Sequence, residues 1–265
     1  MLNIQNISKT FNVGTINEKT ALDNVSLHLE EGDFVTVIGG NGAGKSTLLN
    51  AVAGTWYVDA GSIAIDGIDV TKMPEYRRAN FLGRVFQDPM MGTAATMQID
   101  ENLALAARRG KLRGLKSGIT ASEKEEYRNL LKILDLGLED RLTSKVGLLS
   151  GGQRQAVTLL MATLRKPKLL LLDEHTAALD PKTAAKVLDT TDMIVGRDNL
   201  TTIMITHNMR DAIAHGNRLI MMDSGHIILD IKGEEKKNLT VDDLLQKFAI
   251  ASGEELDNDR MMLTK

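Results

Sequence analysis

Residues 39–46 have the residue types and the spacing of a loop that binds phosphate. They read Gly-Gly-Asn-Gly-Ala-Gly-Lys-Ser, a glycine followed by four residues and then Gly-Lys-Ser. Glycines let the backbone coil so that successive N–H groups point at one anion, and a helix starting near Lys45 adds its positive end. In this pattern the Lys45 ammonium reaches the β- and γ-phosphates and the Ser46 hydroxyl ligates Mg²⁺. The loop predicts a nucleoside triphosphate site, of a kinase, a GTPase, a helicase or another class.

The candidate phosphate-binding residues are Gly39, Gly40, Asn41, Gly42, Ala43, Gly44, Lys45, Ser46 and Thr47. The alternative is a glycine-rich turn that fits by chance. The context argues against chance, because the loop follows a short apolar run that predicts a buried strand and precedes a stretch that predicts a helix.

Two adjacent acids and a serine-glycine turn could carry further chemistry. Asp173 and Glu174 end an apolar run, and two carboxylates there are costly unless a cation or a catalytic task holds them. Residues 150–153 read Ser-Gly-Gly-Gln at the expected start of a helix, where a hydroxyl and glycine N–H groups could form a second anion site. Ser150 could instead be an ordinary helix N-cap.

The string Leu-Ser-Gly-Gly-Gln at residues 149–153 resembles the signature motif of the ABC ATPases, and it stands shortly before the acidic pair, where that family carries it. The resemblance implies that Asp173 holds Mg²⁺ through water and that Glu174 is the general base acting on the attacking water. The cofactors implied are ATP and Mg²⁺. The candidate signature residues are Ser150, Gly151, Gly152 and Gln153.

The remaining motifs follow in the order of that family. Gln87, in Val-Phe-Gln-Asp, resembles the residue that senses Mg²⁺ and the γ-phosphate, and it is a candidate metal ligand. His207 resembles the switch histidine, and Asp180 resembles the loop that crosses the dimer interface. Phe11 stands where the family places the aromatic that stacks on adenine. Taken singly, Phe11 could be a core residue at a strand end and His207 a core or surface histidine.

The resemblance implies that one chain cannot complete a site. Two ATPase subunits would face head to tail as a homodimer, with each ATP between residues 39–46 of one and 150–153 of the other. It also implies membrane permease subunits as partners, an extracytoplasmic solute-binding protein, and a place at the cytoplasmic face of the membrane. Residues 90–97 could grip a permease through Met90, Met91, Thr96 and Met97, or pack in the core.

Some positions depart from the commonest pattern of the family. Gly40 replaces a frequent proline of the loop, and His175 stands where proline often follows the glutamate. Neither removes a group with a chemical role. The string at residues 174–183 resembles uptake ATPases linked to amino acids, with aromatic ones as a candidate. Import is preferred over export, although the segment 12–20 resembles some exporters.

Alternating strand and helix patterns position these motifs. Strands are expected at 25–29, 34–38, 62–68 with a turn at Asp66-Gly67, 168–172, 200–206 and 219–222. Helices are expected at 45–53, from Asp180-Pro181 and at 209–215, and a helical period runs from 97 to 164 with a capping box at Thr120 and Glu123. This predicts an α/β fold with a mostly parallel sheet.

With the resemblance, the expected fold is a P-loop NTPase (RecA-like) core with a mixed or parallel sheet, an N-terminal antiparallel β subdomain and an inserted α-helical subdomain. The expected division is a single ATPase domain at 1–248, with the core at 1–88 and 163–248 and the helical part at about 89–162, and then a tail at 249–265.

Composition limits the partners. The chain has 265 residues, no cysteine and a formal net charge of −3, which excludes disulfides and gives no general attraction for nucleic acid. No stretch of about 18 apolar residues could span a bilayer. The basic run 108–116 is either a solvated loop or a contact with a permease or lipid headgroups. A soluble iron–sulfur assembly ATPase is a further alternative, whereas tandem translation factors and coiled-coil repair ATPases do not fit this length and spacing.

Overall fold

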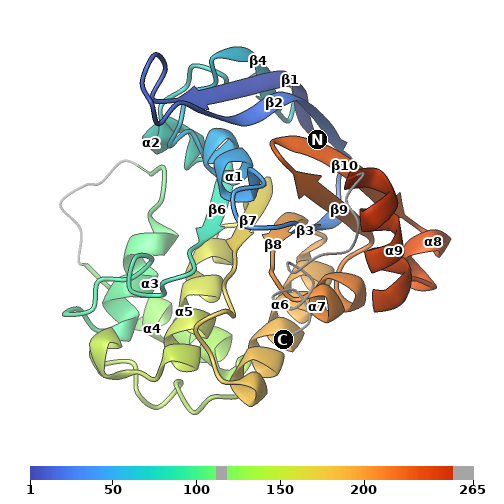
Figure 1. Ribbon diagram of the computed structural model, residues 1–265. Coiled ribbons are helices and arrows are strands. Elements are labelled where there is room, and N and C mark those ends of the chain that lie inside the picture. Colours follow the sequence, from blue (N-terminus) through green and yellow to red (C-terminus); the bar gives the residue numbers. More distant parts are fainter. Residues whose placement is uncertain (112–117, 253–265) are drawn as a thin grey trace.

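A six-stranded sheet forms the centre of the chain in a computed structural model that describes residues 1–111 and 118–252 (Figure 1). Its strands are β3 (Phe34–Ile38), β6 (Leu82–Val85), β7 (Leu169–Asp173), β8 (Thr201–Ile205), β9 (Arg218–Asp223) and β10 (His226–Lys232). The order is β10-β9-β3-β8-β7-β6, and every neighbouring pair is parallel except β10 with β9. Both faces are covered, which explains why β3, β7 and β8 are almost continuously apolar or β-branched.

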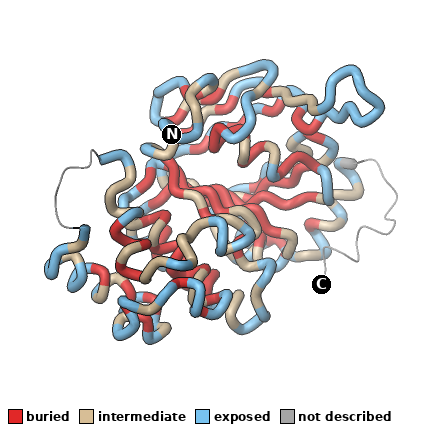
Figure 2. The backbone as a smooth tube through the Cα atoms, turned by 90° about the vertical axis from the view of Figure 1, so that its left-hand side faces the viewer, coloured by how far each residue is buried: buried red, intermediate tan, exposed pale blue. Residues whose placement is uncertain are grey.

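A second, antiparallel sheet has the order β2-β1-β4-β5. Its strands are β1 (Leu2–Phe11), β2 (Lys19–Leu29), β4 (Ala60–Ile65) and β5 (Ile68–Asp69). Asp66 and Gly67 join β4 to β5 with φ angles of 53° and 77°, the positive values that a tight hairpin turn needs. Helix α1 (Lys45–Ala53) packs between the two sheets (Figure 1), and one apolar cluster contains residues of all three. Buried segments fill the centre of the chain (Figure 2).

Helices cover the opposite face of the central sheet. Helices α5 (Gly151–Thr163) and α6 (Pro181–Asp198) share a cluster with β6, β7 and β8. Helices α7 (Met209–Ala214) and α9 (Val241–Ser252) pack beside β9 and β10, and the short α8 (Glu234–Lys237) lies between them in the chain. Helix α9 continues past residue 248, where the tail was expected to begin.

A mostly helical stretch interrupts the sheet between β6 and β7. Helices α3 (Ile99–Ala107) and α4 (Ala121–Lys132), with the 3₁₀ turn η1 (Val146–Leu148), bury a separate apolar cluster against the inner face of α5. The expected capping box is present, since the Thr120 hydroxyl accepts a hydrogen bond from the Glu123 N–H at 3.2 Å. Most of the basic run, residues 112–116, lies outside the described residues.

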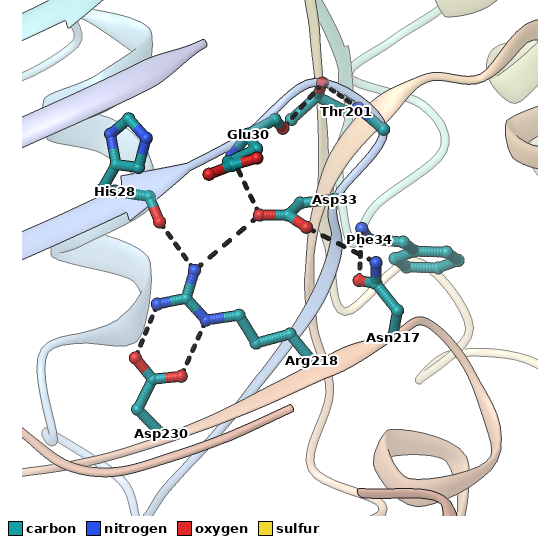
Figure 3. A network of polar contacts seen from close by, with 9 residues as sticks. His28, Glu30, Asp33, Phe34, Thr201, Asn217, Arg218 and Asp230 are labelled. Carbon is teal, nitrogen blue, oxygen red and sulfur yellow. Dashed lines mark hydrogen bonds and ion pairs between the residues drawn. The ribbon is translucent and has the colours of Figure 1, made fainter. Parts of the chain in front are cut away.

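Arg218 ties the two sheets together at the end of β2 (Figure 3). Its guanidinium forms a bidentate ion pair with the Asp230 carboxylate at 2.7 and 2.6 Å and donates a hydrogen bond to the His28 carbonyl at 2.6 Å. Asp33 lies 3.8 Å from the same group and also accepts from the Glu30 N–H at 2.9 Å. The network fixes the turn between β2 and β3, and therefore the strand that leads into the phosphate-binding loop.

The sequence predicted the elements beside the glycine loop and the acidic pair closely. The predicted helix 45–53 coincides with α1, and the predicted strand 34–38 coincides with β3. The predicted turn at Asp66-Gly67 is present, and it separates the segment 62–68 into parts of β4 and β5. Residues 12–18 form turns at the tip between β1 and β2. Strands β1, β6 and β10 were not predicted. Within the described residues, no helix is both long enough and apolar enough to cross a membrane.

Candidate nucleotide-binding site

The glycine loop wraps around the N-terminus of α1 in a conformation that only glycine can adopt at two positions. Gly39 has a φ of 148°, and a Cβ there would lie 2.1 Å from the Met222 carbonyl oxygen. Gly44 has a φ of 102°, and a Cβ there would lie 2.4 Å from the Ala21 carbonyl oxygen. Both are incompatible with a side chain, so the loop keeps its backbone N–H groups close around one point.

Lys45 is buried at the start of α1, with 5% of its surface exposed. Its Nζ donates to the carbonyls of Gly39 at 2.7 Å and Gly40 at 2.9 Å. Burial lowers the pKa of the Lys45 ammonium, and the carboxylates of Glu174 and Asp173 oppose that shift. The ammonium therefore already lies within the loop where a phosphate would be bound.

The acidic pair ends β7, beside β8 and the histidine that follows it. Glu174 has a φ of 45°, a left-handed conformation that costs a non-glycine residue free energy. Its Oε1 lies 2.6 Å from His207 Nε2, which makes the proposed base and the proposed switch direct neighbours. Burial raises the pKa of the Asp173 carboxyl, and the Arg84 guanidinium, 3.8 Å away, opposes the shift.

One pocket of about 440 Å³ brings most of the predicted residues together. The glycine loop contributes Asn41, Gly42, Ala43, Gly44, Ser46 and Thr47. Phe11, Lys45, Glu174 and His207 complete the predicted part of its lining. Asp173, Gly39 and Gly40 lie beside it without lining it, and Gln87 lies exposed in the loop after β6.

Sequence reasoning missed three residues near the site. Lys19 and Ala21 line the pocket from β2, although no motif singles them out. Arg84 reaches Asp173 from β6 and was also missed. The sequence of β6 offered a signal for Arg84. It is a charged residue within a short strand whose other residues are buried, so its side chain needed a polar partner.

Phe11 lines the pocket beside Trp56, an aromatic residue that sequence reasoning did not single out. The rings of Phe11 and Trp56 are 5.5 Å apart at 83°, an edge-to-face arrangement. Lys9 Nζ lies 5.6 Å from the centre of the Phe11 ring. The interpretation of Phe11 as a core residue is not supported, because the ring is only partly buried and lines the pocket.

Residues 150–153 do not line the pocket, and they form a second, separate helix N-terminus. Ser150 is an N-cap: its hydroxyl accepts from the Gln153 N–H at 3.3 Å, while the Gln153 side chain accepts from the Ser150 N–H at 3.2 Å. Capping leaves the hydroxyl hydrogen free to donate, so the cap and an anion site are compatible. Asp180 is likewise the exposed N-cap of α6, and its hydrogen bonds with Thr183 lower its pKa.

The donor set fits Mg²⁺ bound together with a nucleotide. Ser46 offers a hydroxyl, Asp173 a carboxylate and Gln87 an amide oxygen, all hard oxygen donors. No cluster of three His, Cys, Asp or Glu side chains suited to a metal occurs in residues 1–111 and 118–252. Mg²⁺ keeps water and phosphate oxygens as ligands, so it does not need such a cluster.

The residues after Gln87 lie at the surface more than in the core. Met90 is 44% exposed and Met91 is 69% exposed. Thr96 is also exposed, and Met97 is half-buried. Exposure of two methionines on one loop favours a binding surface over plain core packing.

Comparisons with known proteins agree with these motifs. Residues 22–177 match the family model described as "ABC transporter". A "Tyrosine transport ATP-binding protein" of Clostridioides difficile is 47% identical over 251 residues, covering 95% of this chain and all of that protein. A "Phosphonates import ATP-binding protein PhnC" of Lactobacillus johnsonii is 30% identical and covers 96% of this chain and 99% of that protein.

A longer relative and two solved structures complete the comparison. The "Methionine import ATP-binding protein MetN" of Bartonella henselae is 34% identical over 86% of this chain, which spans 64% of that protein. A dimeric structure of the ATP-binding cassette MJ0796 bound to ADP and Pi has a TM-score of 0.75 at 30% identity, over 88% of this chain and 98% of that one. MJ1267 in its ADP conformation also gives 0.75, at 28% identity over 96% and 99%.

Proposed function

The chain belongs to the family of ABC transporter ATP-binding proteins, and on that premise we propose that it powers the import of an amino acid through separate membrane permease subunits. The amino acid that we propose is an aromatic one. The chain is an ATPase, as the family and its relatives establish. The observation that supports the substrate class is the 47% identity to a tyrosine transport ATP-binding protein over that protein's full length.

The proposed hydrolysis uses side chains that already surround one pocket. Lys45 and the loop amides bind the β- and γ-phosphates, and Phe11 stacks on adenine. Glu174 takes the proton of the attacking water, and His207, 2.6 Å from it, holds that carboxylate and contacts the γ-phosphate. Mg²⁺, held by Ser46, Asp173 and Gln87, would neutralise charge on the phosphates.

A second copy of the chain would supply residues 150–153 to this pocket. Ser150 and Gly151 are exposed at a helix N-terminus away from the pocket of their own chain, which suits contact in trans. Asp180, exposed at the start of α6, would lie at the same interface. The dimeric cassette with ADP and Pi, which resembles this fold, supports such an arrangement.

The proposed partners place the chain at the cytoplasmic face of the membrane. Met90 and Met91 present an adaptable apolar surface beside Gln87, and we infer that a permease loop docks there. An extracytoplasmic solute-binding protein would deliver the amino acid. We also infer the division into a core at 1–88 and 163–248 and a helical part at 89–162, since the cluster around α3 and α4 is separate from the sheet core.

Affinity purification tests this proposal. The tagged chain would be purified from detergent-solubilised membranes of its own organism, and co-purifying proteins identified by mass spectrometry. We expect a multi-span permease, and a solute-binding protein that binds aromatic amino acids. Recovery of a periplasm-spanning adaptor would replace import by export. Recovery of soluble assembly proteins alone would contradict the transport proposal and leave the ATPase unaffected.

A further inference from the structure

Arg84 lies on the wrong face of its strand for a charged residue. β6 pairs with β7 in parallel, with Arg84 opposite Leu171. Leu171 and Leu82 both belong to the apolar cluster that packs against α1, so strand alternation places Arg84 on that face too. Two residues beyond Leu171 on the same face of β7 is Asp173, the proposed Mg²⁺ carboxylate. An apolar side chain would be expected at this position.

The Arg84 guanidinium joins the glycine-loop helix to the acidic strand. Its Nη2 donates to Asn50 Oδ1 at 2.7 Å and lies 3.8 Å from Asp173 Oδ2. Its Nη1 donates to Thr55 Oγ1 at 3.1 Å, just beyond the end of α1. The group also lies over the Phe86 ring at 4.5 Å, next to Gln87 in the chain.

Stability does not account for this cation. Its side chain is 15% exposed, Nε is buried with no hydrogen-bond partner, and the nearest carboxylate oxygen is beyond hydrogen-bond distance. Burying a charge has a desolvation cost that is repaid only when the geometry is excellent and the donors are satisfied. Here Nε has no partner, and the carboxylates of Asp173 and Glu75 lie 3.8 and 3.9 Å away. The position of Arg84 beside Asp173 therefore points to a role in the site.

Arg84 supplies one of the positive charges beside the acidic pair. Burial raises the pKa of the Asp173 carboxyl, Arg84 and Lys45 oppose that shift, and Glu174 adds to it. Arg84 also lies 3.9 Å from Glu75, through Nη1 rather than the Nη2 that faces Asp173. Removing Arg84 would leave the acidic pair with one positive charge fewer beside the pocket. A negatively charged pair of carboxylates attracts a divalent cation.

We propose that Arg84 is a positioning residue that acts as a built-in counter-cation for Asp173, and that it prevents the acidic pair from holding a divalent cation until a nucleotide brings one. This deepens the proposed function and rests on the Mg²⁺ site assigned there to Asp173. Metal and nucleotide then enter together and leave together. The contact with Phe86 places Gln87, the third proposed Mg²⁺ ligand, next in the chain to the same guanidinium.

The test measures Mn²⁺ binding to the full-length, nucleotide-free protein by electron paramagnetic resonance. We expect Arg84→Met to bind Mn²⁺ at least about tenfold more tightly than the parent, because a unit charge close to a divalent ion is removed. Arg84→Lys, which keeps the charge, should stay close to the parent. With EDTA present, Arg84→Met should bind ATP more weakly. Thermal unfolding checks that each variant is folded, because removing one member of a buried ion pair lowers the stability of a protein.

Asp173→Asn distinguishes a failure of the counter-cation proposal for Arg84 from a failure of the metal site assigned to Asp173. In the Arg84→Met background it should remove the gained Mn²⁺ affinity. If Arg84→Met binds Mn²⁺ no better than the parent while Asp173→Asn weakens Mn²⁺ binding in the presence of ATP, the counter-cation proposal is wrong and the metal site stands. If Asp173→Asn has no effect with ATP present, the metal assignment itself fails.

Discussion

Side chains at the site are held in states that would be unfavourable elsewhere. Glu174 adopts a left-handed backbone conformation, and Lys45 is buried among carbonyl oxygens. The left-handed conformation of Glu174 costs of order 1–3 kcal/mol and persists only because its surroundings hold it in place. The Glu174 backbone N–H donates to the Ile205 carbonyl at 3.1 Å, and its side chain meets His207. The carboxylate is thus aimed before any nucleotide arrives.

The aromatic pair provides a spectroscopic test of the adenine site. Trp56 is the chain's only tryptophan, and its ring is 5.5 Å from Phe11. ATP should therefore change the intrinsic fluorescence in a titration. Phe11→Ala should weaken ATP binding by about 1–3 kcal/mol, the worth of one base stacked on an aromatic ring. Phe11→Tyr is the matched control and should bind like the parent. Unchanged affinity in Phe11→Ala would remove Phe11 from the site.

At the scale of elements, close packing between α5 and α6 fixes residues 150–153 relative to Asp180. Helix α5 begins at Gly151 and lies against α6, which begins just after the proposed dimer-interface residue Asp180. Gly152 is buried at this contact, and a Cβ there would lie 2.0 Å from Thr183 Cγ2. The two helix N-termini are therefore positioned by one another.

Gly152→Ala should separate α5 from α6 and lower the free energy of unfolding by about 1–3 kcal/mol, as overpacking usually does. Gly196→Ala is the matched control, because Gly196 is exposed in the last turn of α6 with nothing within 4 Å of its missing Cβ. That control should stabilise the protein by about 0.5–1 kcal/mol. Urea unfolding measures both. Equal effects of the two substitutions would contradict the close packing at Gly152.

A second contact between elements should depend on pH. His215 Nδ1, after α7, lies 2.6 Å from Asp192 Oδ2 on α6, and this hydrogen bond raises the pKa of His215, helped by Asp211 and Asp189 and opposed by burial. A raised pKa means that the stabilisation is complete below the unfolded histidine pKa and is lost as pH rises through the folded one. Lys236, the nearby cation, donates to the carbonyls of Ile213, His215 and Gly216.

Asp192→Asn should therefore destabilise the protein by roughly 1 kcal/mol at pH 6, a value reduced for partial exposure, and by less at pH 8.5. Thermal unfolding at both pH values measures the difference. Asp198→Asn, at the end of the same helix and paired with Arg197, is the control whose effect should not change across this range. A constant deficit for Asp192→Asn between pH 6 and 8.5 would mean that the pair does not form.

For the whole molecule, the decisive feature is that the pocket and residues 150–153 of the same chain do not meet. The pocket is lined by the glycine loop, Phe11, Glu174 and His207, whereas Ser150 and Gly151 are exposed away from it. The proposed head-to-tail dimer would join each pocket to residues 150–153 of the other chain, so that ATP holds the subunits together and hydrolysis releases them.

Glu174→Gln should lower turnover by about 10²–10⁴-fold while keeping ATP binding, because it removes the proposed general base and leaves the loop intact. With ATP and Mg²⁺ it should elute as a stable dimer in size-exclusion chromatography. Adding Ser150→Arg should abolish the dimer and leave ATP binding by the monomer unchanged. If Ser150→Arg also removed ATP binding by the monomer, residues 150–153 would not act in trans.

The sequence alone determined the local chemistry, because each motif is contiguous. Residues 39–46, the signature at 149–153 and the pair Asp173 and Glu174 each carry their pattern within a few positions, and helix α1 follows from local propensity and glycine placement. From these motifs the α/β fold and the ATPase family could be predicted, and both are confirmed.

Only the tertiary structure decided which side chains reach the site from strands that carry no motif. Arg84 meets Asp173 because β6 lies beside β7, a pairing between segments more than 80 residues apart. Lys19 lines the pocket from β2, and Trp56, in the loop after α1, contacts Phe11 at the end of β1. These contacts join segments that are distant in the sequence. Strand pairing depends on burial and on distant partners, so no local pattern predicts such contacts.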